Sequence, residues 1–529
     1  MKNIDCLLVR VPKFHNYYKL LGPYVSHTYM TFGLLSVADN LERNGFKTQV
    51  IHLYLELLND SKFSLEEYIK KHNVKVVGLS LAFHHQSFDV IEAAKSVKAA
   101  CPDTYVMLGG MTASFFGAEI MKDFDAVDGI IRGEGEKPLL DFMKERKKDE
   151  PDYATVPNLV WRKSGEIVEN ERSYVATNED LDNLCFTNFS LLKNYKLYQN
   201  LRKGYVDTNL PRKFTYAVQN MLSRPDQILY GLCMGKACMG HCAHCCAGKK
   251  GQLATNNRAQ VGFRSHEKVI EEIIMAQEYG YKGFYISFEP FPTDMTDFYT
   301  EFFAKIRERK IEFRLRYSAW GLPNEQFIDA FKETCTPNSA IMISPESASE
   351  NIRKKNKSWF FTNADLLERL AYLEKLEIRT SLYFSYGLTH ETEKEVMDTI
   401  ALQDVIKKRF KKVHIETFPI EIEPGAPRHL DPEKYGIVVT RSSFMDFYNT
   451  HSSNSSSMST LGFYKTNFFG DEINDEKEFS DRMLKLKCKY FCKRTRAAQP
   501  FICAIMDPCW KISRFLKISG DQPPPSGPV

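Results

Sequence analysis

Short apolar runs alternate with amphipathic stretches along the first 140 residues of the chain. Residues 30–45 repeat their apolar positions at helical spacing and close on Gly45, which is typical of a helix end. The apolar runs around this helix are six to eight residues long and predict strands. The predicted strands span residues 6–11, 47–53, 74–81, 105–110 and 126–133. Buried strands that alternate with helices favour a doubly wound parallel sheet with both faces covered.

The same alternation returns between residues 226 and 435. A helix is predicted over 266–278, where the apolar positions recur on one face. The predicted strands of this second series span residues 227–232, 283–288, 311–317, 340–344, 379–384 and 412–417. This succession of strand–helix units predicts a partial (βα)6 barrel of the TIM type, open on one side. The active site of such a barrel lies at the carboxyl ends of its strands.

The pattern divides the chain into four regions. Residues 1–145 and 226–435 form the two α/β domains, and residues 146–225 are a bridging region that contains a short hairpin. Residues 436–529 form a small, mostly helical C-terminal segment that ends in a frayed, proline-rich tail.

Composition narrows the class of protein. A chain of 529 residues is long enough for two or more domains, and 43% hydrophobic with 26% charged residues is ordinary for a globular protein. The net charge of +4 is small for this length and gives no case for a nucleic-acid surface. The apolar runs are too short to span a bilayer, and the N-terminus resembles a strand rather than a secretion signal. We therefore expect a cytoplasmic protein with neither a membrane nor nucleic acid as its partner.

Three cysteines follow the first strand of the second series at the spacing C-x3-C-x2-C. They are Cys238, Cys242 and Cys245. Thiolates this close together bind soft metal centres. A four-iron cluster held by three thiolates keeps one iron open for a cofactor or substrate, so this spacing indicates a reactive site.

Other interpretations of these cysteines remain open. His241 and His244 lie within the same loop and allow a structural zinc site. Disulfides are disfavoured in a reducing cytosol. Cys233 and Cys246 lie close to the triplet and are further candidate ligands. Two adjacent cysteines such as Cys245 and Cys246, however, rarely bind one cluster.

A second group of cysteines lies near the C-terminus. Its spacing matches no known ligand pattern, so the group holds either an auxiliary cluster or ordinary buried thiols. Its members are Cys488, Cys492, Cys503 and Cys509.

Small residues end several predicted strands of the first domain. At the carboxyl edge of a parallel sheet such residues let a cofactor approach the backbone, and they equally suit tight turns. They are Ser80, Gly109, Gly110 and Gly133.

Taken together, these features resemble the radical S-adenosylmethionine (SAM) superfamily. The segment 1–140 resembles the Rossmann-like, cobalamin-binding domain that precedes the radical domain in one large subgroup. The resemblance covers roughly residues 1–430 and rests on strand-end motifs in the right order. These motifs are Phe288-Glu-Pro-Phe, Ser344-Pro-Glu-Ser, Asn356-Lys357, Tyr386-Gly-Leu-Thr-His-Glu-Thr and Pro424-Gly-Ala-Pro, with Gly33-Leu-Leu and Arg132-Gly-Glu-Gly-Glu in the first domain.

The resemblance implies three cofactors. They are a [4Fe-4S] cluster on Cys238, Cys242 and Cys245, SAM on the open iron of that cluster, and cobalamin. The residues implied for SAM are His244, Glu289, Ser344, Glu346 and Ser347, and those implied for cobalamin are Ser80, Gly109, Gly110 and Gly133. Three departures from the family pattern are His244 in place of an apolar ring, Ser344 in place of glycine, and Thr389-His390 in place of Pro-Gly.

The cobalamin-ligating signature Asp-x-His-x-x-Gly does not occur in the first domain. No histidine ligand to cobalt is therefore expected. His15, His84 and His85, which lie near predicted strand ends, are interpreted as ordinary loop histidines.

The resemblance also implies an activity. The reduced cluster of the family cleaves SAM to a 5′-deoxyadenosyl radical, and the cofactor carries this chemistry. The expected function is C-methylation of an unactivated carbon of a small molecule or peptide, with two SAM consumed per methyl and a reductant such as flavodoxin or ferredoxin. Alternatives are a non-methylating rearrangement, cyclisation or oxidation, a methylthiotransferase, or a non-catalytic binder. Catalytic side chains are not indicated.

Overall fold

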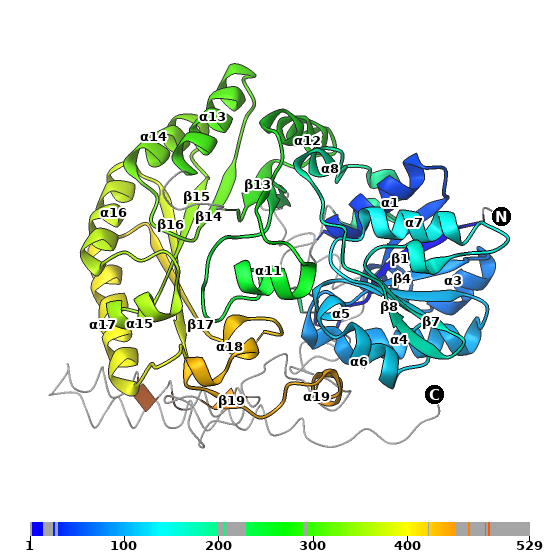
Figure 1. Cartoon of the computed structure of the whole chain (residues 1–529). Coiled ribbons are helices and arrows are strands. Elements are labelled where there is room, and N and C mark those ends of the chain that lie inside the picture. The colour runs from blue at the N-terminus through cyan, green and yellow to red at the C-terminus, as the bar shows by residue number, and fades with distance from the viewer. Residues whose placement is uncertain are drawn as a thin grey trace.

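Two α/β domains lie side by side in the computed structural model of the chain (Figure 1). The structure describes residues 3–13, 25–26, 30–198, 205–206, 229–288, 295–421, 423–450, 464–465, 482 and 485–486. The second cysteine group, Glu289 and His15 fall outside the described residues.

The N-terminal domain is built on a seven-stranded sheet of order β3-β1-β4-β5-β6-β7-β8. Its first five strands in that order are parallel, as predicted. They are β3 (Thr48–His52), β1 (Cys6–Arg10), β4 (Val76–Ser80), β5 (Tyr105–Gly109) and β6 (Gly129–Ile131). Leu8 and Val9 of β1 point to opposite faces and are both buried, because helices cover both faces of the sheet.

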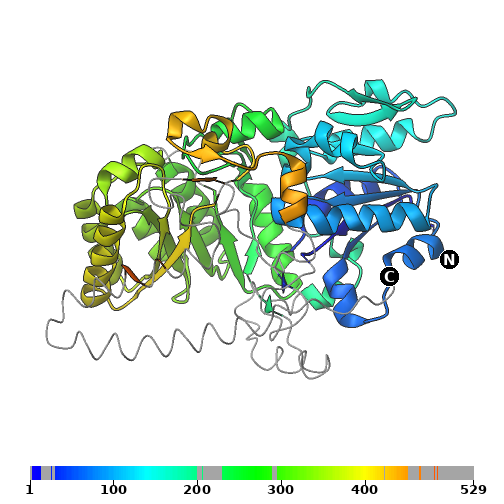
Figure 2. The same ribbon diagram turned by 90° about the horizontal axis from the view of Figure 1, so that it is seen from below.

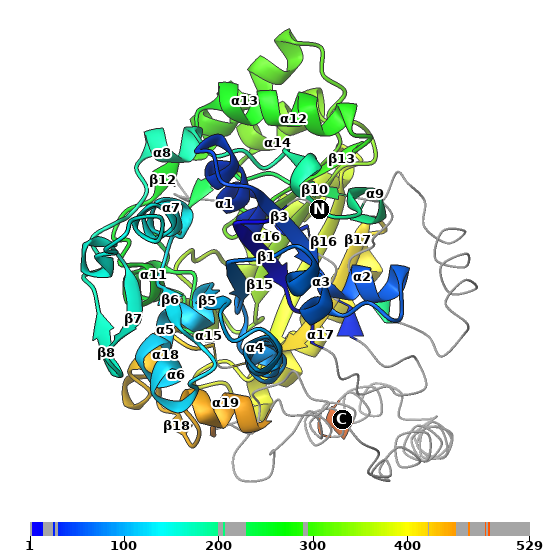
Figure 3. The ribbon, with the colours of Figure 1, turned by 90° about the vertical axis from the view of Figure 1, so that its right-hand side faces the viewer.

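Helices cover the two faces in separate groups (Figure 3). One face packs on α1 (Phe32–Arg43) and α7 (Glu136–Glu145), and the other on α3 (Leu65–Lys71), α4 (Ser87–Ala100) and α6 (Gly117–Asp123). Alternate residues of β1 enter the two cores: Leu8 packs into the first and Val9 into the second. The prediction of a doubly wound domain is confirmed.

The predicted hairpin of the bridging region joins this sheet. β7 (Leu159–Lys163) pairs antiparallel with β6 and with β8 (Glu166–Glu169). Ser164 and Gly165 have φ of 51° and 90°, the left-handed values that a two-residue hairpin turn requires. The sheet is therefore mixed, because a tight turn can join only antiparallel strands.

The second domain contains a six-stranded sheet of order β10-β13-β14-β15-β16-β17. All its strands are parallel. They are β10 (Leu229–Gly231), β13 (Gly283–Ile286), β14 (Leu315–Ala319), β15 (Ala340–Glu346), β16 (Arg379–Tyr386) and β17 (Val413–Pro419). The outer helices are α12 (His266–Glu278), α13 (Met295–Glu308), α14 (Glu325–Thr334), α16 (Asn363–Lys375) and α17 (Glu393–Arg409), which form an arc outside the strands (Figure 1).

This sheet confirms the predicted partial barrel. One strand is shifted: β14 begins at Leu315, four residues later than its apolar pattern predicted. Lys310 has a φ of 53°, so the chain turns there, and Phe313 forms only an isolated bridge with Cys335. Phe313 is buried without belonging to the sheet, so burial alone made its segment resemble a strand.

Part of the C-terminal segment returns to the first domain. The helix α19 (Phe444–Thr450) packs against α4 and α6, as Figures 1 and 2 show. The Phe444 N–H donates a 2.7 Å hydrogen bond to Glu119, and the Tyr448 hydroxyl donates one of 2.7 Å to Glu92. No helix in the described residues is long and apolar enough to cross a membrane.

Candidate cofactor site

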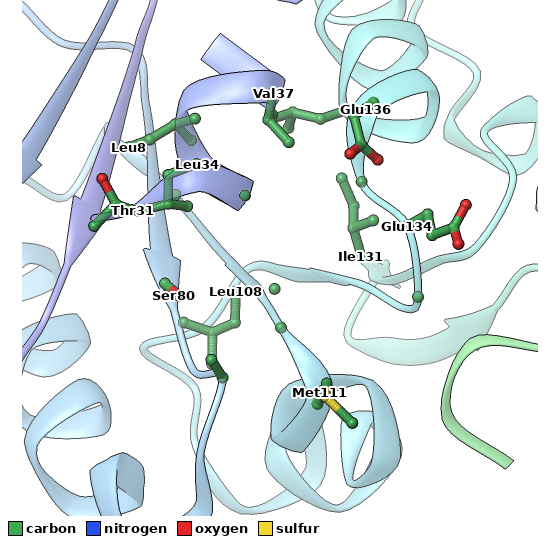
Figure 4. Close-up of a pocket in the computed structure, with 18 of the residues that line it drawn as sticks. Leu8, Thr31, Leu34, Val37, Ser80, Leu108, Met111, Ile131, Glu134 and Glu136 are labelled. Atoms are coloured by element: carbon green, nitrogen blue, oxygen red, sulfur yellow. The ribbon is translucent and has the colours of Figure 1, made fainter. Parts of the chain in front are cut away.

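A cavity of about 660 Å³ lies beyond the carboxyl ends of the N-terminal strands (Figure 4). Ser80 ends β4, Gly109 ends β5, Gly110 follows β5 and Gly133 follows β6; all four line this cavity. The structure thus brings together the four residues that the sequence predicted around cobalamin. The volume falls within the range of ordinary cofactor pockets.

Two of these glycines are required by the backbone. Gly110 has a φ of 107°, and a Cβ there would lie 2.7 Å from the carbonyl oxygen of Leu81. Gly133 has a φ of 78°, and its Cβ would lie 3.3 Å from the Cα of Asn256. A side chain is strained at both positions, so both turns depend on glycine.

The remaining walls of the cavity are mostly apolar. Aliphatic side chains surround it together with a few polar groups, which is typical of a site for a large, partly apolar cofactor. The aliphatic lining includes Leu8, Leu34, Val37, Leu108, Met111 and Ile131 (Figure 4). Among the described lining residues there is no histidine. His84, which follows β4, does not line the cavity, and its Nε2 lies 3.6 Å from Glu423 Oε2.

The second domain forms the far wall. Lys236 and Ala237 line the cavity, as do Gln252 and Asn256 of α11 (Lys249–Asn256). Ala237 has a φ of 77°, unusual for a non-glycine residue, and it directly precedes Cys238. The cavity therefore adjoins the start of the cysteine loop.

Charged side chains join the two domains at this wall. Lys236 Nζ lies 3.1 Å from Glu136 Oε1, and Arg258 binds Glu134 through Nε at 2.7 Å and Nη2 at 3.0 Å. Burial disfavours the charged form of Lys236, but the attraction of the Glu136 and Glu134 carboxylates is larger than this effect and raises the pKa of Lys236. Burial likewise favours neutral Glu134, but Lys236 and Arg258 lower its pKa. Lys236 and Glu134 are thus held in their charged forms.

Backbone hydrogen bonds hold the cysteine loop against the barrel. The Ala243 N–H donates to the carbonyl of Asn356 (2.9 Å), and the Ala243 carbonyl accepts from the Arg428 N–H (3.0 Å). The Ser358 N–H donates to Cys242 Sγ at 3.5 Å. The segment after β15 therefore positions the loop, which explains why Asn356-Lys357 belongs to the motif set.

The thiols of this loop fit an iron–sulfur cluster chemically. The Gly240 N–H donates to Cys238 Sγ at 3.2 Å, a bond that favours a thiolate. Burial, reinforced by the neighbouring Cys242, raises the pKa of Cys245 to about 11, so its thiolate needs a nearby positive charge such as iron. Among the described residues, no group of three or more His, Cys, Asp or Glu side chains is placed to hold a single metal ion. In a four-iron cluster each thiolate instead binds its own iron.

Glu346 connects the end of β15 to this loop. It is buried, has a φ of 64° and accepts a hydrogen bond from Ser385. Lys357 lies 3.5 Å from its carboxylate and also donates to the Ser344 carbonyl. Burial, together with Arg428 and Lys357, lowers the pKa of His244 to about 4, although Glu346 opposes this shift.

The predicted SAM residues thus divide into two groups. His244, Ser344 and Glu346 gather at the carboxyl end of β15, beside the cysteine loop. Ser347 is fully buried, and its hydroxyl lies 3.4 Å from that of Thr399 on α17. It therefore supports the turn that follows β15.

The sequence did not predict the basic side of the cavity. Of the lining residues, Lys236 lies on β11 (Gly235–Lys236), which pairs with β12 (Gly262–Phe263), and Gln252 and Asn256 lie on α11. No periodicity indicated these elements, and Arg258 follows α11 without lining the cavity. The sequence motif Arg132-Gly-Glu-Gly-Glu contained Glu134 and Glu136, but the basic residues that pair with these carboxylates lie at least 100 residues away in the sequence.

Comparison with protein families supports this architecture. Residues 232–402 match the model of the radical SAM superfamily, and residues 18–142 match the B12 binding domain. The chain is therefore a radical SAM enzyme. It belongs to the branch that carries a cobalamin-binding domain, and its cofactors are a [4Fe-4S] cluster, SAM and cobalamin.

Two curated relatives resemble parts of the chain. A methyltransferase of Pyrococcus horikoshii, described as uncharacterized, is 23% identical over 365 residues, which are 65% of this chain and 67% of that protein. The hopanoid C-3 methylase of Methylococcus capsulatus is 30% identical over 105 residues, so the chain matches only 20% of that enzyme's length.

Solved structures share the fold. The radical SAM methyltransferase TsrM of Kitasatospora setae, with tryptophan and a SAM analogue bound, has a TM-score of 0.60 at 16% identity. This match covers 82% of this chain and 78% of TsrM. TsrM with cobalamin and a [4Fe-4S] cluster matches with a TM-score of 0.60 at 15% identity, covering 84% and 81% of the two chains.

Proposed function

We propose that this enzyme transfers a methyl group to an unactivated carbon of a small molecule or peptide. The observation that carries the proposal is the shared wall of the cavity: Lys236 and Ala237 line it, and the cysteine triplet begins at the next residue. Cobalamin in the cavity and a cluster on the triplet would thus face a common space. A radical formed beside the cluster and a methyl donor in the cavity must meet over a short distance.

The proposed contacts combine the predicted motifs with the positions of the described residues. Cys238, Cys242 and Cys245 hold the cluster. His244, Ser344 and Glu346 lie beside SAM, and Glu289 is proposed on the motif alone. Ser80, Gly109, Gly110 and Gly133 contact the corrin. Ser347 acts as a support for the turn rather than as a direct SAM contact, because its hydroxyl faces Thr399.

When bound, the cluster, SAM and cobalamin supply the radical and the methyl group. The chain itself binds and orients these cofactors and limits the access of water. Trp359 covers Gly240: a Cβ at Gly240 would lie 2.7 Å from the Trp359 ring. The ring centroid of Trp320 lies 5.8 Å from that of Trp359, so a second indole packs against the one that covers the loop.

Two further expectations belong to this proposal. The electron donor is a small redox protein such as flavodoxin or ferredoxin. The enzyme works in the cytoplasm, where a reducing environment keeps the cluster thiols free.

The product set tests the proposal. Purified protein with iron, sulfide, cobalamin and a strong reductant is incubated with SAM that carries a deuterated methyl group and with candidate substrates. Methyl transfer gives S-adenosylhomocysteine, 5′-deoxyadenosine and a product that gains the labelled methyl, with two SAM consumed per methyl. Formation of 5′-deoxyadenosine with a substrate-derived product that gains no methyl would replace the proposal with a rearrangement, cyclisation or oxidation.

A further inference from the structure

The sulfur of Cys242 is hydrogen-bonded by a distant segment of the chain. The Ser358 N–H donates to Cys242 Sγ at 3.5 Å, although the two residues are 116 positions apart in the sequence. The other two proposed cluster ligands, Cys238 and Cys245, have backbone donors within the cysteine loop itself. These donors are the N–H groups of Gly240, Ala247 and Gly248. The surroundings of Cys242 therefore depend on how the barrel places Ser358.

The Ser358 hydroxyl is a second group beside the same sulfur. Its Oγ lies 3.9 Å from Cys242 Sγ, and it accepts a hydrogen bond from the His241 N–H. A neutral thiol would donate its proton to this oxygen. A thiolate has no proton, so the hydroxyl becomes the donor when Cys242 binds iron. The bond from His241 polarises the hydroxyl and makes it a better donor.

The segment that carries Ser358 is held on both sides. Before it, the Asn356 side chain exchanges two hydrogen bonds of 2.9 Å with the backbone of Thr389, and its carbonyl accepts from the Ala243 N–H. After it, the ring of Trp359 is buried against the cysteine loop. Ser358 itself is exposed, so water competes for the same sulfur. The serine differs from water because both of its donors are fixed in place.

Donors of this kind affect how easily an iron–sulfur cluster is reduced. Hydrogen bonds to the sulfur ligands help to set the reduction potential of the cluster. The reduced cluster carries one more negative charge than the oxidised cluster, so each donor stabilises the reduced form more strongly. Removal of a donor therefore lowers the potential.

We propose that Ser358 raises the reduction potential of the [4Fe-4S] cluster by donating to Cys242 Sγ through its hydroxyl as well as through its N–H. Ser358 is a positioning residue, because it acts through Cys242 and not on SAM or the substrate. The proposal rests on the proposed function, since it requires Cys242 to be a ligand of the cluster that cleaves SAM.

A redox titration of the cluster tests this role. The reconstituted full-length protein is poised with mediators under argon, and the reduced cluster is measured by electron paramagnetic resonance. Ser358→Ala removes the hydroxyl and keeps the N–H. At the wild-type midpoint potential, the ratio of reduced to oxidised cluster should fall at least threefold, which is about 28 mV for one electron. Ser358→Thr keeps a hydroxyl and should restore the wild-type ratio.

The rate of SAM cleavage gives a second measurement. With flavodoxin hydroquinone as the electron donor, Ser358→Ala should form 5′-deoxyadenosine about threefold more slowly than the wild type, because less of its cluster is reduced. With excess titanium(III) citrate, which reduces the cluster of both proteins, the two rates should agree. A purely structural role of Ser358 would lower both rates, and that result overturns the proposal.

A matched control and three further contrary outcomes complete the test. Ser190→Ala makes the same change at an exposed serine of the bridging region and should leave the potential unaltered. Equal potentials of Ser358→Ala and wild type, at equal iron and sulfide content, overturn the proposal. So does a Ser358→Thr variant that keeps the lowered potential. Loss of iron and sulfide in Ser358→Ala also overturns it, because the serine would then secure the cluster rather than tune it.

Failure of the proposed function has different signs. A full cluster in Cys242→Ala would refute the ligand, and 5′-deoxyadenosine without a methylated product would refute methyl transfer. The redox titration needs no substrate, so the absence of methyl transfer would not change the measured potential.

Discussion

Lys236 Nζ lies 3.1 Å from Glu136 Oε1, across the boundary between the two α/β domains. Lys236 stands two residues before Cys238, and Glu136 begins α7 beside the cavity beyond the N-terminal strands. One ion pair therefore links the wall of the proposed cobalamin site to the proposed cluster loop.

Removing this ion pair should weaken cobalamin binding. Lys236→Met leaves the carboxylate of Glu136 buried without its cation, which costs more than the pair contributes. We expect about a tenfold loss of cobalamin affinity in an absorbance titration. The exchanged pair Lys236→Glu with Glu136→Lys should recover part of the loss, whereas Lys305→Met, in an exposed pair with Glu267, should have no effect. Equal affinity in Lys236→Met and wild type would contradict the link.

The neighbouring pair should determine how firmly the domains dock. Arg258 and Glu134 are both buried and joined by two hydrogen bonds. Arg258→Met leaves Glu134 buried and unpaired, so the free energy of unfolding should fall by about 3 kcal/mol. The double variant Arg258→Met with Glu134→Leu should lose less. Thermal unfolding measures both, and a larger loss in the double variant would argue against this explanation.

The cysteines of the loop should differ in their effect on the cluster. Alanine in place of Cys238, Cys242 or Cys245 should abolish the iron–sulfur absorbance and the acid-labile sulfide of the reconstituted protein. Cys246→Ala and Cys233→Ala should keep both, since these two cysteines lie outside the C-x3-C-x2-C triplet, and they serve as matched controls. A full cluster in Cys242→Ala would refute the assignment of ligands.

A methyl group at Gly33 should separate binding from folding. Gly33 is the second residue of α1 and lines the cavity, and a Cβ there would meet no atom within 4 Å. Gly33→Ala should therefore leave the melting temperature unchanged or slightly higher, since alanine favours helices, while it narrows the cavity and weakens cobalamin binding. Gly110→Ala should instead lower the melting temperature, because its Cβ would collide with the carbonyl of Leu81. Unchanged cobalamin affinity in Gly33→Ala would place the corrin elsewhere.

A buried carboxyl predicts how stability depends on pH. Glu391 is fully buried, and burial raises its pKa to about 8, although the N–H groups of Gly387 and Leu388 donate to it. The folded protein therefore holds a proton that the unfolded chain releases above its ordinary pKa of 4.5, so folding loses stability as the pH rises from about 4.5 to 8. Glu391→Gln lacks this loss. Its melting temperature relative to wild type should rise between pH 5 and pH 8 and then level off; a constant difference would contradict the shift.

The sequence predicted local structure well wherever burial is periodic. The helix predicted over 266–278 has these bounds in the structure, because its apolar positions recur on one face and Ser265 caps its start. The turn at Thr389-His390 departs from the family's Pro-Gly, yet His390 adopts a φ of 64°, the left-handed conformation that glycine favours. The backbone geometry of this turn is kept although the residue differs.

By itself, the sequence determined the order of strands and helices, the cysteine triplet and the small residues at strand ends. These features follow from side-chain period and turn chemistry, which act over a few residues. Only the tertiary structure decided that Lys236 meets Glu136, that Arg258 meets Glu134, and that the cavity adjoins the cysteine loop. Partners at least 100 residues apart leave no local pattern, since their contact depends on how two separately patterned domains pack against each other.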